Sequence, residues 1–202
     1  WLLTVSCSDH YQAFDSIAAS TKGFSREPLQ VDCVAYCPVN STNVSIKQPS
    51  GNSFVMHHDH LYFSQWRFDN AVNPCRKNGT RLCVLHTGMT FSFPGCRLEI
   101  LLTGDDMFGR ISDRRFEAAS TVCRFTAPGG VSMLMLSDAN AQSADRMRAL
   151  YGDSLKSDIC QAAGHGESDF PPEVYDLIRP SILLYPCAQW AYDLTTDAGV
   201  GV

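Results

Sequence analysis

The chain has 202 residues, of which 45% are hydrophobic and 18% are charged, and its formal net charge is −5. This length suits one domain that buries a substantial core, and the balance of residue types is that of an ordinary globular protein. The negative charge argues against nucleic-acid binding, which requires a basic surface, and no apolar run is long enough to span a membrane.

Short apolar or alternating segments recur along the chain and predict many short β-strands. Turn residues such as those of Pro94-Gly95 and Pro128-Gly129-Gly130 separate them. The predicted strands cover residues 2–7, 29–36, 43–47, 53–68, 81–86, 89–93, 97–103, 120–126, 131–136, 155–160, 182–187 and 189–194. The pattern predicts one all-β domain over residues 1–202, an antiparallel β-sandwich linked by disulfides.

Two segments interrupt the strands with helical patterns. Ser143–Ser154 opens with a residue suited to cap a helix, and Pro171–Pro180 begins with prolines and ends at one. The polar stretch Ala162–Asp169, with the sequence AAGHGESD, is expected to be a mobile loop with one histidine rather than a catalytic turn. We therefore expect one or two short helices on the sandwich.

Nine cysteines spread over nearly the whole length predict disulfides formed in an oxidising compartment. Only Cys33 and Cys37 are closely spaced, and no second pair completes a zinc motif. The odd number means that one thiol is free, that it pairs between two chains as in a homodimer, or that its partner lies outside this sequence.

Glycosylation signals support the same compartment. Three Asn-x-Ser/Thr sequons occur in polar, turn-rich segments, at Asn40, Asn43 and Asn78. The sequence begins with Trp1, as after removal of a signal peptide. We expect a secreted, extracellular glycoprotein.

The stretch VMHHDHLYFSQW, Val55–Trp66, raises the question of a metal site. In a strand, alternation places His58 and His60 on one face and the other two polar residues of HHDH on the opposite face. A zinc site would need one or two further ligands, for which His86 is a candidate, and no H-E-x-x-H motif is present. We interpret the stretch as a structural strand bordering a partner surface and keep a zinc-dependent hydrolase as an alternative.

Other enzyme signatures are absent from the sequence. There is no G-x-S-x-G motif, and Gly129-Gly130 lacks the context of a nucleotide-binding loop. Tyr62, Phe63, Trp66 and Trp190 are instead residue types that favour the centres of protein interfaces. The residues therefore favour a binding protein that is not an enzyme and needs no cofactor, with a structural ectodomain as a further alternative.

Three segments, taken in order, resemble the poxvirus family of secreted immune-evasion proteins, in particular its parapoxvirus chemokine-binding type. They are GMTFSFPGCRLEI (Gly88–Ile100), DRMRALYGDSLKSDIC (Asp145–Cys160) and EVYDLIRPSILLYPCAQWAYDL (Glu173–Leu194). The resemblance implies a disulfide-containing β-sandwich and a decoy that masks host chemokines, so that receptor engagement and leukocyte recruitment are blocked. Affinity would come from apolar anchors, and association rate from acidic groups facing basic partners.

The resemblance also implies a binding surface. Its residues fall on Asp153, Ser181, Ile182, Leu183 and Arg81, and we add Asp59 and Tyr62 from the aromatic strand. The long acidic loop of the relatives is missing here. A sibling branch binds granulocyte-macrophage colony-stimulating factor and interleukin-2 and remains an alternative, although its W-x-x-W-like motif is also absent.

Overall fold

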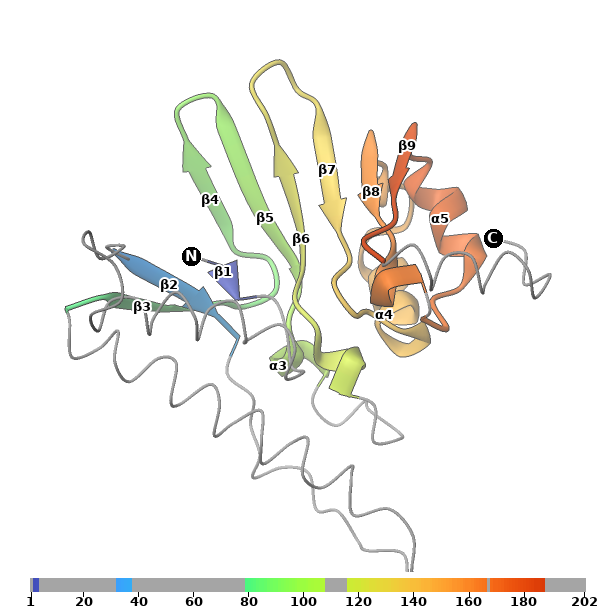
Figure 1. The fold of residues 1–202 in the computed structure, drawn as a ribbon, viewed down its shortest axis with the longest axis horizontal. Coiled ribbons are helices and arrows are strands. Elements are labelled where there is room, and N and C mark those ends of the chain that lie inside the picture. Colours follow the sequence, from blue (N-terminus) through green and yellow to red (C-terminus); the bar gives the residue numbers. More distant parts are fainter. Residues whose placement is uncertain (1, 4–31, 38–78, 108–115, 167, 188–202) are drawn as a thin grey trace, which may run out of the picture.

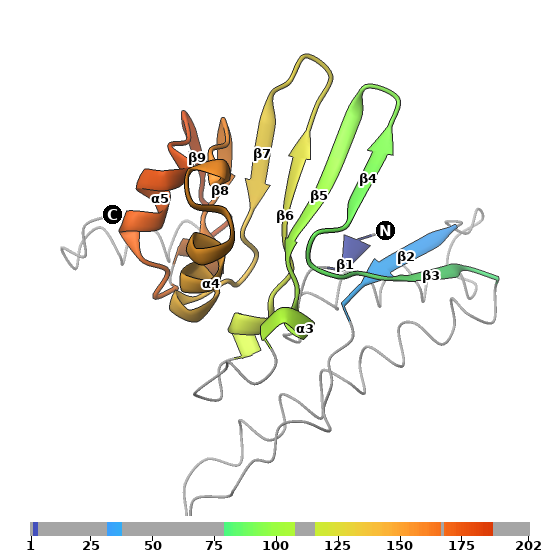
Figure 2. The ribbon, with the colours of Figure 1, turned by 180° about the vertical axis from the view of Figure 1, so that it is seen from behind.

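The computed structural model of the chain describes residues 2–3, 32–37, 79–107, 116–166 and 168–187. These residues form a three-stranded sheet, ordered β1-β2-β3, and a six-stranded sheet, ordered β4-β5-β6-β7-β8-β9. Figures 1 and 2 show the small sheet at the end of the large one where β4 and β5 lie. The candidate site described below lies toward the other end, beyond β7 and β8.

The two sheets combine parallel and antiparallel pairing. The small sheet is parallel throughout and contains β1 (Leu2–Leu3), β2 (Cys33–Tyr36) and β3 (Arg81–Val84). In the large sheet, four successive antiparallel strands are β4 (Thr90–Phe93), β5 (Cys96–Leu102), β6 (Val122–Thr126) and β7 (Ser132–Met135). Two parallel strands then follow β7, namely β8 (Ile159–Gln161) and β9 (Ile182–Leu184).

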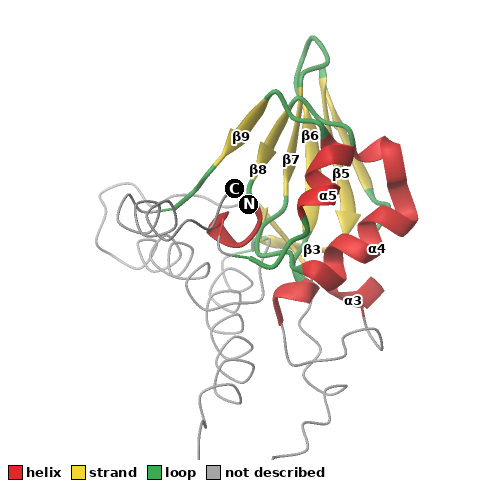
Figure 3. Cartoon of the chain, turned by 90° about the vertical axis from the view of Figure 1, so that its right-hand side faces the viewer, coloured by secondary structure: helices red, strands yellow, loops and turns green. Residues whose placement is uncertain are grey.

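Helices make the parallel connections, which a tight hairpin turn cannot make. The segment from β7 to β8 contains α4 (Ala141–Tyr151) and the 3-10 turn η3 (Gly152–Leu155). The segment from β8 to β9 contains a second 3-10 turn, η4 (Ala163–Gly166), and α5 (Pro172–Ile178). Two further short helices, α3 (Gly104–Met107) and η2 (Phe116–Ala119), lie between β5 and β6 in the chain. Figure 3 shows α4 and α5 on the same face of the large sheet.

Local sequence explains where these helices begin and end. Asn140 caps α4 by accepting hydrogen bonds from the backbone N–H groups of Gln142 and Ser143, and Ser143 completes the capping box. In α5, Pro172 occupies the first turn, where its missing N–H costs nothing. Arg179 ends that helix in the left-handed conformation, with φ of 48°.

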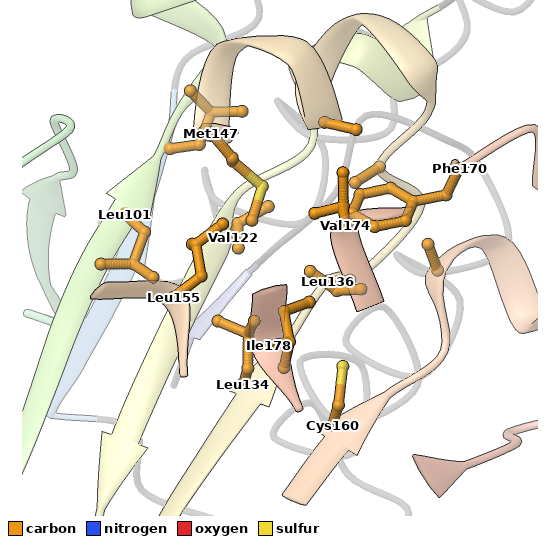
Figure 4. Close-up of a cluster of buried hydrophobic side chains, with 14 of the residues drawn as sticks. Leu101, Val122, Leu134, Leu136, Met147, Leu155, Cys160, Phe170, Val174 and Ile178 are labelled. Atoms are coloured by element: carbon orange, nitrogen blue, oxygen red, sulfur yellow. The ribbon is translucent and has the colours of Figure 1, made fainter. Parts of the chain in front are cut away.

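Alternating side chains give the large sheet a buried cluster on each face. Val122, Leu134 and Cys160 point toward the helices and pack with residues such as Met147 and Ile178, as Figure 4 shows. On the opposite face, a smaller buried cluster consists of Leu85, Ile100 and Cys123, against which Ala35 of the small sheet and Met135 pack. The large sheet is thus the middle layer of the described structure.

The prediction of a disulfide-linked all-β sandwich is wrong. The fold is mixed α/β, and no cysteines in the described residues are at disulfide distance from one another. An alternating pattern of apolar residues identifies a strand but neither its neighbour nor its direction. The sequence pattern therefore could not predict the parallel pairing of β7, β8 and β9. The predicted strand 155–160 shows the error locally: Leu155 ends a 3-10 turn, and β8 begins only at Ile159.

Several predictions lie outside the described residues. They include the strands at 43–47, 53–68 and 189–194, and the domain boundaries 1–202 stay a prediction. Among the helices that the structure describes, none has the length and apolarity needed to cross a membrane.

Candidate functional site

Asp138 lies in a tight turn directly after β7. Ser137, before it, has a positive φ of 54°, a conformation that non-glycine residues rarely adopt. The Ser137 N–H donates to Oε1 of Gln161, the last residue of β8, over 3.0 Å. Asp138 is itself buried, with only 9% of its side chain exposed. A strained turn stabilised by the neighbouring strand therefore holds a carboxylate at the end of the sheet.

His165 lies in the turn after β8, within η4. Three successive residues, Gly164, His165 and Gly166, have positive φ values of 52°, 59° and 88°. The N–H of Gly164 donates to the carbonyl of Ser137 over 2.8 Å. Ser168 Oγ donates to the carbonyl of Ala139, immediately after Asp138, over 2.6 Å. These bonds tie the two turns together.

The Asp138 carboxylate and the His165 imidazole face each other across a distance longer than a hydrogen bond. Asp138 Oδ1 and His165 Nε2 are 3.8 Å apart. The other ring nitrogen, Nδ1, lies 2.9 Å from the carbonyl oxygen of Pro186, which only accepts, so Nδ1 carries the proton. Nε2 is the ring nitrogen that faces the Asp138 carboxylate.

Asp138 and His165 are both residue types that zinc binds, through a carboxylate oxygen and an imidazole nitrogen. In a tetrahedral site with bonds of about 2.0–2.2 Å, two such atoms would lie about 3.4 Å apart, so the pair would have to approach slightly from the observed 3.8 Å to hold one ion. Metal-binding histidines commonly donate their other N–H to a backbone carbonyl, as His165 does to Pro186. The pair alone is incomplete, because the described residues contain no group of three or more candidate ligands.

The position of the pair also suits a ligand site. Asp138 and His165 follow the carboxyl ends of two neighbouring parallel strands, where open α/β sheets usually bind ligands. Tyr175 of α5 stabilises the start of the turn that contains His165, since its hydroxyl accepts the N–H of Ala163 over 3.1 Å. Burial raises the pKa of Tyr175 to about 12, so the hydroxyl stays protonated.

A second polar cluster joins the β3–β4 connection to α3. His86 Nδ1 lies 2.5 Å from Oδ2 of Asp105, and the Thr103 hydroxyl donates to the other carboxylate oxygen, Oδ1. Burial would raise the pKa of Asp105, but the hydrogen bonds from Thr103 and His86 outweigh it and lower that pKa. Burial raises the pKa of the nearby Cys37 thiol. His86, predicted as a third zinc ligand, is thus paired elsewhere, and the structure does not group it with Asp138 and His165.

The predicted partner surface is spread over different elements. Asp153 is exposed in η3, while Ile182 and Leu183 on β9 are 52% and 37% exposed. Ser181 is exposed next to them, whereas Arg81 lies in the small sheet. The remaining predicted residues lie outside the described part of the chain: Asp59, Tyr62, His58, His60 and the three sequon asparagines.

Sequence reasoning did not single out Asp138, and it interpreted the segment with His165 as a mobile loop rather than a functional turn. A usable signal was present, because each follows a predicted buried segment within a few residues. The sequence did not show that these segments are neighbouring parallel strands, and only that pairing brings the two side chains together.

Comparison with known proteins gives little further information. No protein family and no curated protein matches the chain. Among solved structures, the chain is similar to CmlA, a diiron beta-hydroxylase from Streptomyces venezuelae, at 15% identity and a TM-score of 0.35. The match covers 79% of this chain and 36% of that protein. A similarity this distant carries no argument about fold or function.

Proposed function

We propose that the chain is a metal-dependent hydrolase, with zinc as the preferred ion and Asp138 and His165 as two of its ligands. The observation that carries the proposal is the 3.8 Å approach of a buried carboxylate oxygen to an imidazole nitrogen, while the other ring nitrogen lies 2.9 Å from the Pro186 carbonyl oxygen. The expectation of a binding protein that is not an enzyme stays a prediction. The β-sandwich fold that was predicted together with it is wrong.

The side chains would perform distinct parts of the chemistry. Zinc, when bound, acts as a Lewis acid and lowers the pKa of a coordinated water toward neutrality. Asp138 would supply a negative charge from a largely buried position to hold the cation. His165 supplies a neutral nitrogen and is more open, with 44% of its side chain exposed. The open side of His165 is where we expect a substrate to approach.

A hydrolytic zinc site usually has three protein ligands. The histidine-rich stretch with His58 and His60, which the sequence already singled out, contains the candidates for the missing ligand. Those residues lie outside the described structure. Their participation is part of the proposal, and the substitutions His58→Ala and His60→Ala test it by the zinc content of the protein.

The deciding experiment measures zinc and hydrolysis together. Protein purified without a histidine tag is equilibrated with zinc, and its metal content is measured. Its hydrolysis of three esters is then measured, namely p-nitrophenyl acetate, p-nitrophenyl phosphate and a p-nitrophenyl phosphodiester. We expect stoichiometric zinc in the unmodified chain and at least ~10-fold weaker zinc binding in Asp138→Asn and His165→Gln. Asp176→Asn, an exposed carboxylate on α5, is the matched control and should bind zinc normally.

Two results would reject the proposal. One is the absence of stoichiometric zinc from folded, unmodified protein. The other is unchanged zinc binding in both Asp138→Asn and His165→Gln, which would place any metal elsewhere. Zinc binding with no turnover of the three esters would reject hydrolysis of those ester classes and leave a metal-binding protein.

A secreted decoy for host chemokines is the second candidate, with other cytokines as the alternative partners. The exposure of Ile182 and Leu183 on β9 supports it, because these residues were predicted to be apolar anchors. Surface plasmon resonance against a chemokine and cytokine panel tests it. We expect association that slows with added salt and weaker binding by Asp153→Lys. Absence of binding across the panel would eliminate this candidate.

A further inference from the structure

The face of the large sheet that points away from α4 and α5 is apolar across all of its strands. The strand registers place one row of side chains on that face, with one residue from each strand. From β4 to β9 this row is Phe91, Leu98, Phe125, Met133, Ile159 and Ile182. The next row, from β5 to β9, is Ile100, Cys123, Met135, Gln161 and Leu184. Neither row contains a charged residue.

The small sheet covers the part of this face that is farthest from the β4–β5 and β6–β7 turns. Ile100 and Cys123 are fully buried in the cluster that Ala35 of the small sheet joins. Figures 1 and 2 show the two turns pointing away from the small sheet. Phe93 beside the β4–β5 turn is 55% exposed, and Ile182 on β9 is 52% exposed. We define the open face as Phe93, Phe125, Met133, Ile159 and Ile182.

Apolar side chains on both sides of the same strands show that the open face is suited to being covered. A sheet face in contact with water normally carries polar side chains at every second position. In β7, Leu134 points toward the helices while Met133, its neighbour, lies on the open face. In β8, Cys160 and Ile159 are divided in the same way. An uncharged apolar surface of this kind marks an interaction site.

The arrangement of the covered half indicates what fits the open half. A sheet already packs there, because the small sheet contributes Ala35 to the cluster with Ile100 and Cys123. Stacked sheets bury apolar inner faces against each other. A second copy of the chain supplies another sheet face without charges, and a two-fold axis would bring the two together with no charge at the contact. The net charge of −5 disfavours the alternative of an anionic membrane surface.

We propose that the open face is a self-association surface, on which a second copy of the chain packs face to face about a two-fold axis. The proposal is independent of the metal-dependent function. Asp138 and His165 follow the carboxyl ends of β7 and β8, whereas Met133 and Ile159 lie near the amino ends of these strands. The dimer therefore leaves the candidate site accessible.

Sedimentation velocity of the full chain without metal tests the proposal, at concentrations from about 1 µM to about 500 µM. We expect a reversible monomer–dimer equilibrium. Ile182→Glu should weaken self-association at least ~100-fold, because the two-fold axis places an unpaired carboxylate in the contact twice. Leu183→Glu is the matched control and should change it less than ~3-fold, since that side chain is 37% exposed and pairs with Cys160 on the opposite face of the same strand.

A second variant guards against a loss of folding in Ile182→Glu. Phe93→Glu introduces the same charge at the other end of the open face, on a different strand, and should also weaken the dimer at least ~10-fold. Thermal unfolding of each variant confirms that it is folded. Comparable weakening by both folded variants, with Leu183→Glu unaffected, supports the face-to-face contact.

Three results would overturn the proposal. The first is a monomer at every concentration. The second is equal weakening by Ile182→Glu and Leu183→Glu, which would show that the copies pair through the edge of β9 and not through the open face. The third is co-sedimentation of monomeric chain with phosphatidylcholine vesicles that Ile182→Glu abolishes, which would assign the open face to a lipid surface.

Discussion

At the scale of single residues, Glu99 and Arg124 form a largely buried ion pair outside the candidate site. Arg124 Nε donates to Glu99 Oε2 over 2.9 Å, and both side chains are less than one fifth exposed. Arg124 also donates to the carbonyl of Ser154 over 2.7 Å. One guanidinium therefore joins two neighbouring strands, β5 and β6, to η3.

This pair predicts a specific loss of stability in acid. The hydrogen bond from Arg124, opposed by burial, lowers the pKa of Glu99 below its ordinary value. A lowered folded-state pKa contributes stability that is complete above the unfolded-state pKa, about 4.3, and is lost as the pH falls through the folded-state value. We expect Glu99→Gln to cost about 1 kcal/mol at pH 7, and we expect this cost to shrink as the pH falls below about 4.3 and Glu99 becomes protonated.

Urea unfolding at several pH values measures this difference. Asp105 and Asp158 also have lowered pKa values, so both proteins lose stability in acid, and only the difference between them reports Glu99. Asp176→Asn serves as the control because it is exposed. A Glu99→Gln cost that stays constant from pH 7 to pH 3 would show that the charge of Glu99 is not what stabilises the fold.

At the scale of elements, α4 depends on its N-terminal cap. The Asn140 side chain satisfies two backbone N–H groups that no carbonyl of the helix can reach. α4 also buries Ala144 and Met147 in the core on the large sheet. Any weakening of the cap is therefore transmitted to the packing of the sheet.

Replacing Asn140 by alanine tests the cap. We expect Asn140→Ala to lower the free energy of unfolding by about 1 kcal/mol, because both N–H groups lose their acceptor near the buried start of the helix. Asn140→Ser keeps an acceptor oxygen and should recover most of that loss. Thermal and urea unfolding measure both variants. Equal stabilities of Asn140→Ala and Asn140→Ser would contradict the capping role.

Elements were more predictable than their arrangement. The predicted strands 89–93, 120–126 and 131–136 contain β4, β6 and β7, and the predicted helices overlap α4 and α5. Local signals suffice there, since proline, capping residues and alternation act within a few positions. Pairing partners are set by contacts between distant segments, so the parallel half of the sheet was missed. Because Asp138 and His165 meet only through that pairing, the candidate site was missed with it.

At the scale of the whole molecule, two buried thiols mark the two faces of one sheet. Cys123 on β6 belongs to the cluster shared with the small sheet, and Cys160 on β8 belongs to the cluster under the helices. Both side chains are fully buried, and burial raises the pKa of each thiol to about 12. Neither thiolate is populated at neutral pH in the folded chain, so both react slowly until the protein unfolds.

These thiols allow the cooperativity of the layers to be measured. Iodoacetamide labelling across a urea series, followed by peptide mass spectrometry, gives a separate unfolding midpoint for Cys123 and for Cys160. We expect one common midpoint, because strands β6, β7 and β8 are contiguous and opening either face removes the support of the other. The more exposed Cys96 at the β4–β5 hairpin should react before urea is added. Earlier labelling of Cys123 than of Cys160 would mean that the small sheet detaches first and that the layer carrying Asp138 and His165 is stable without it.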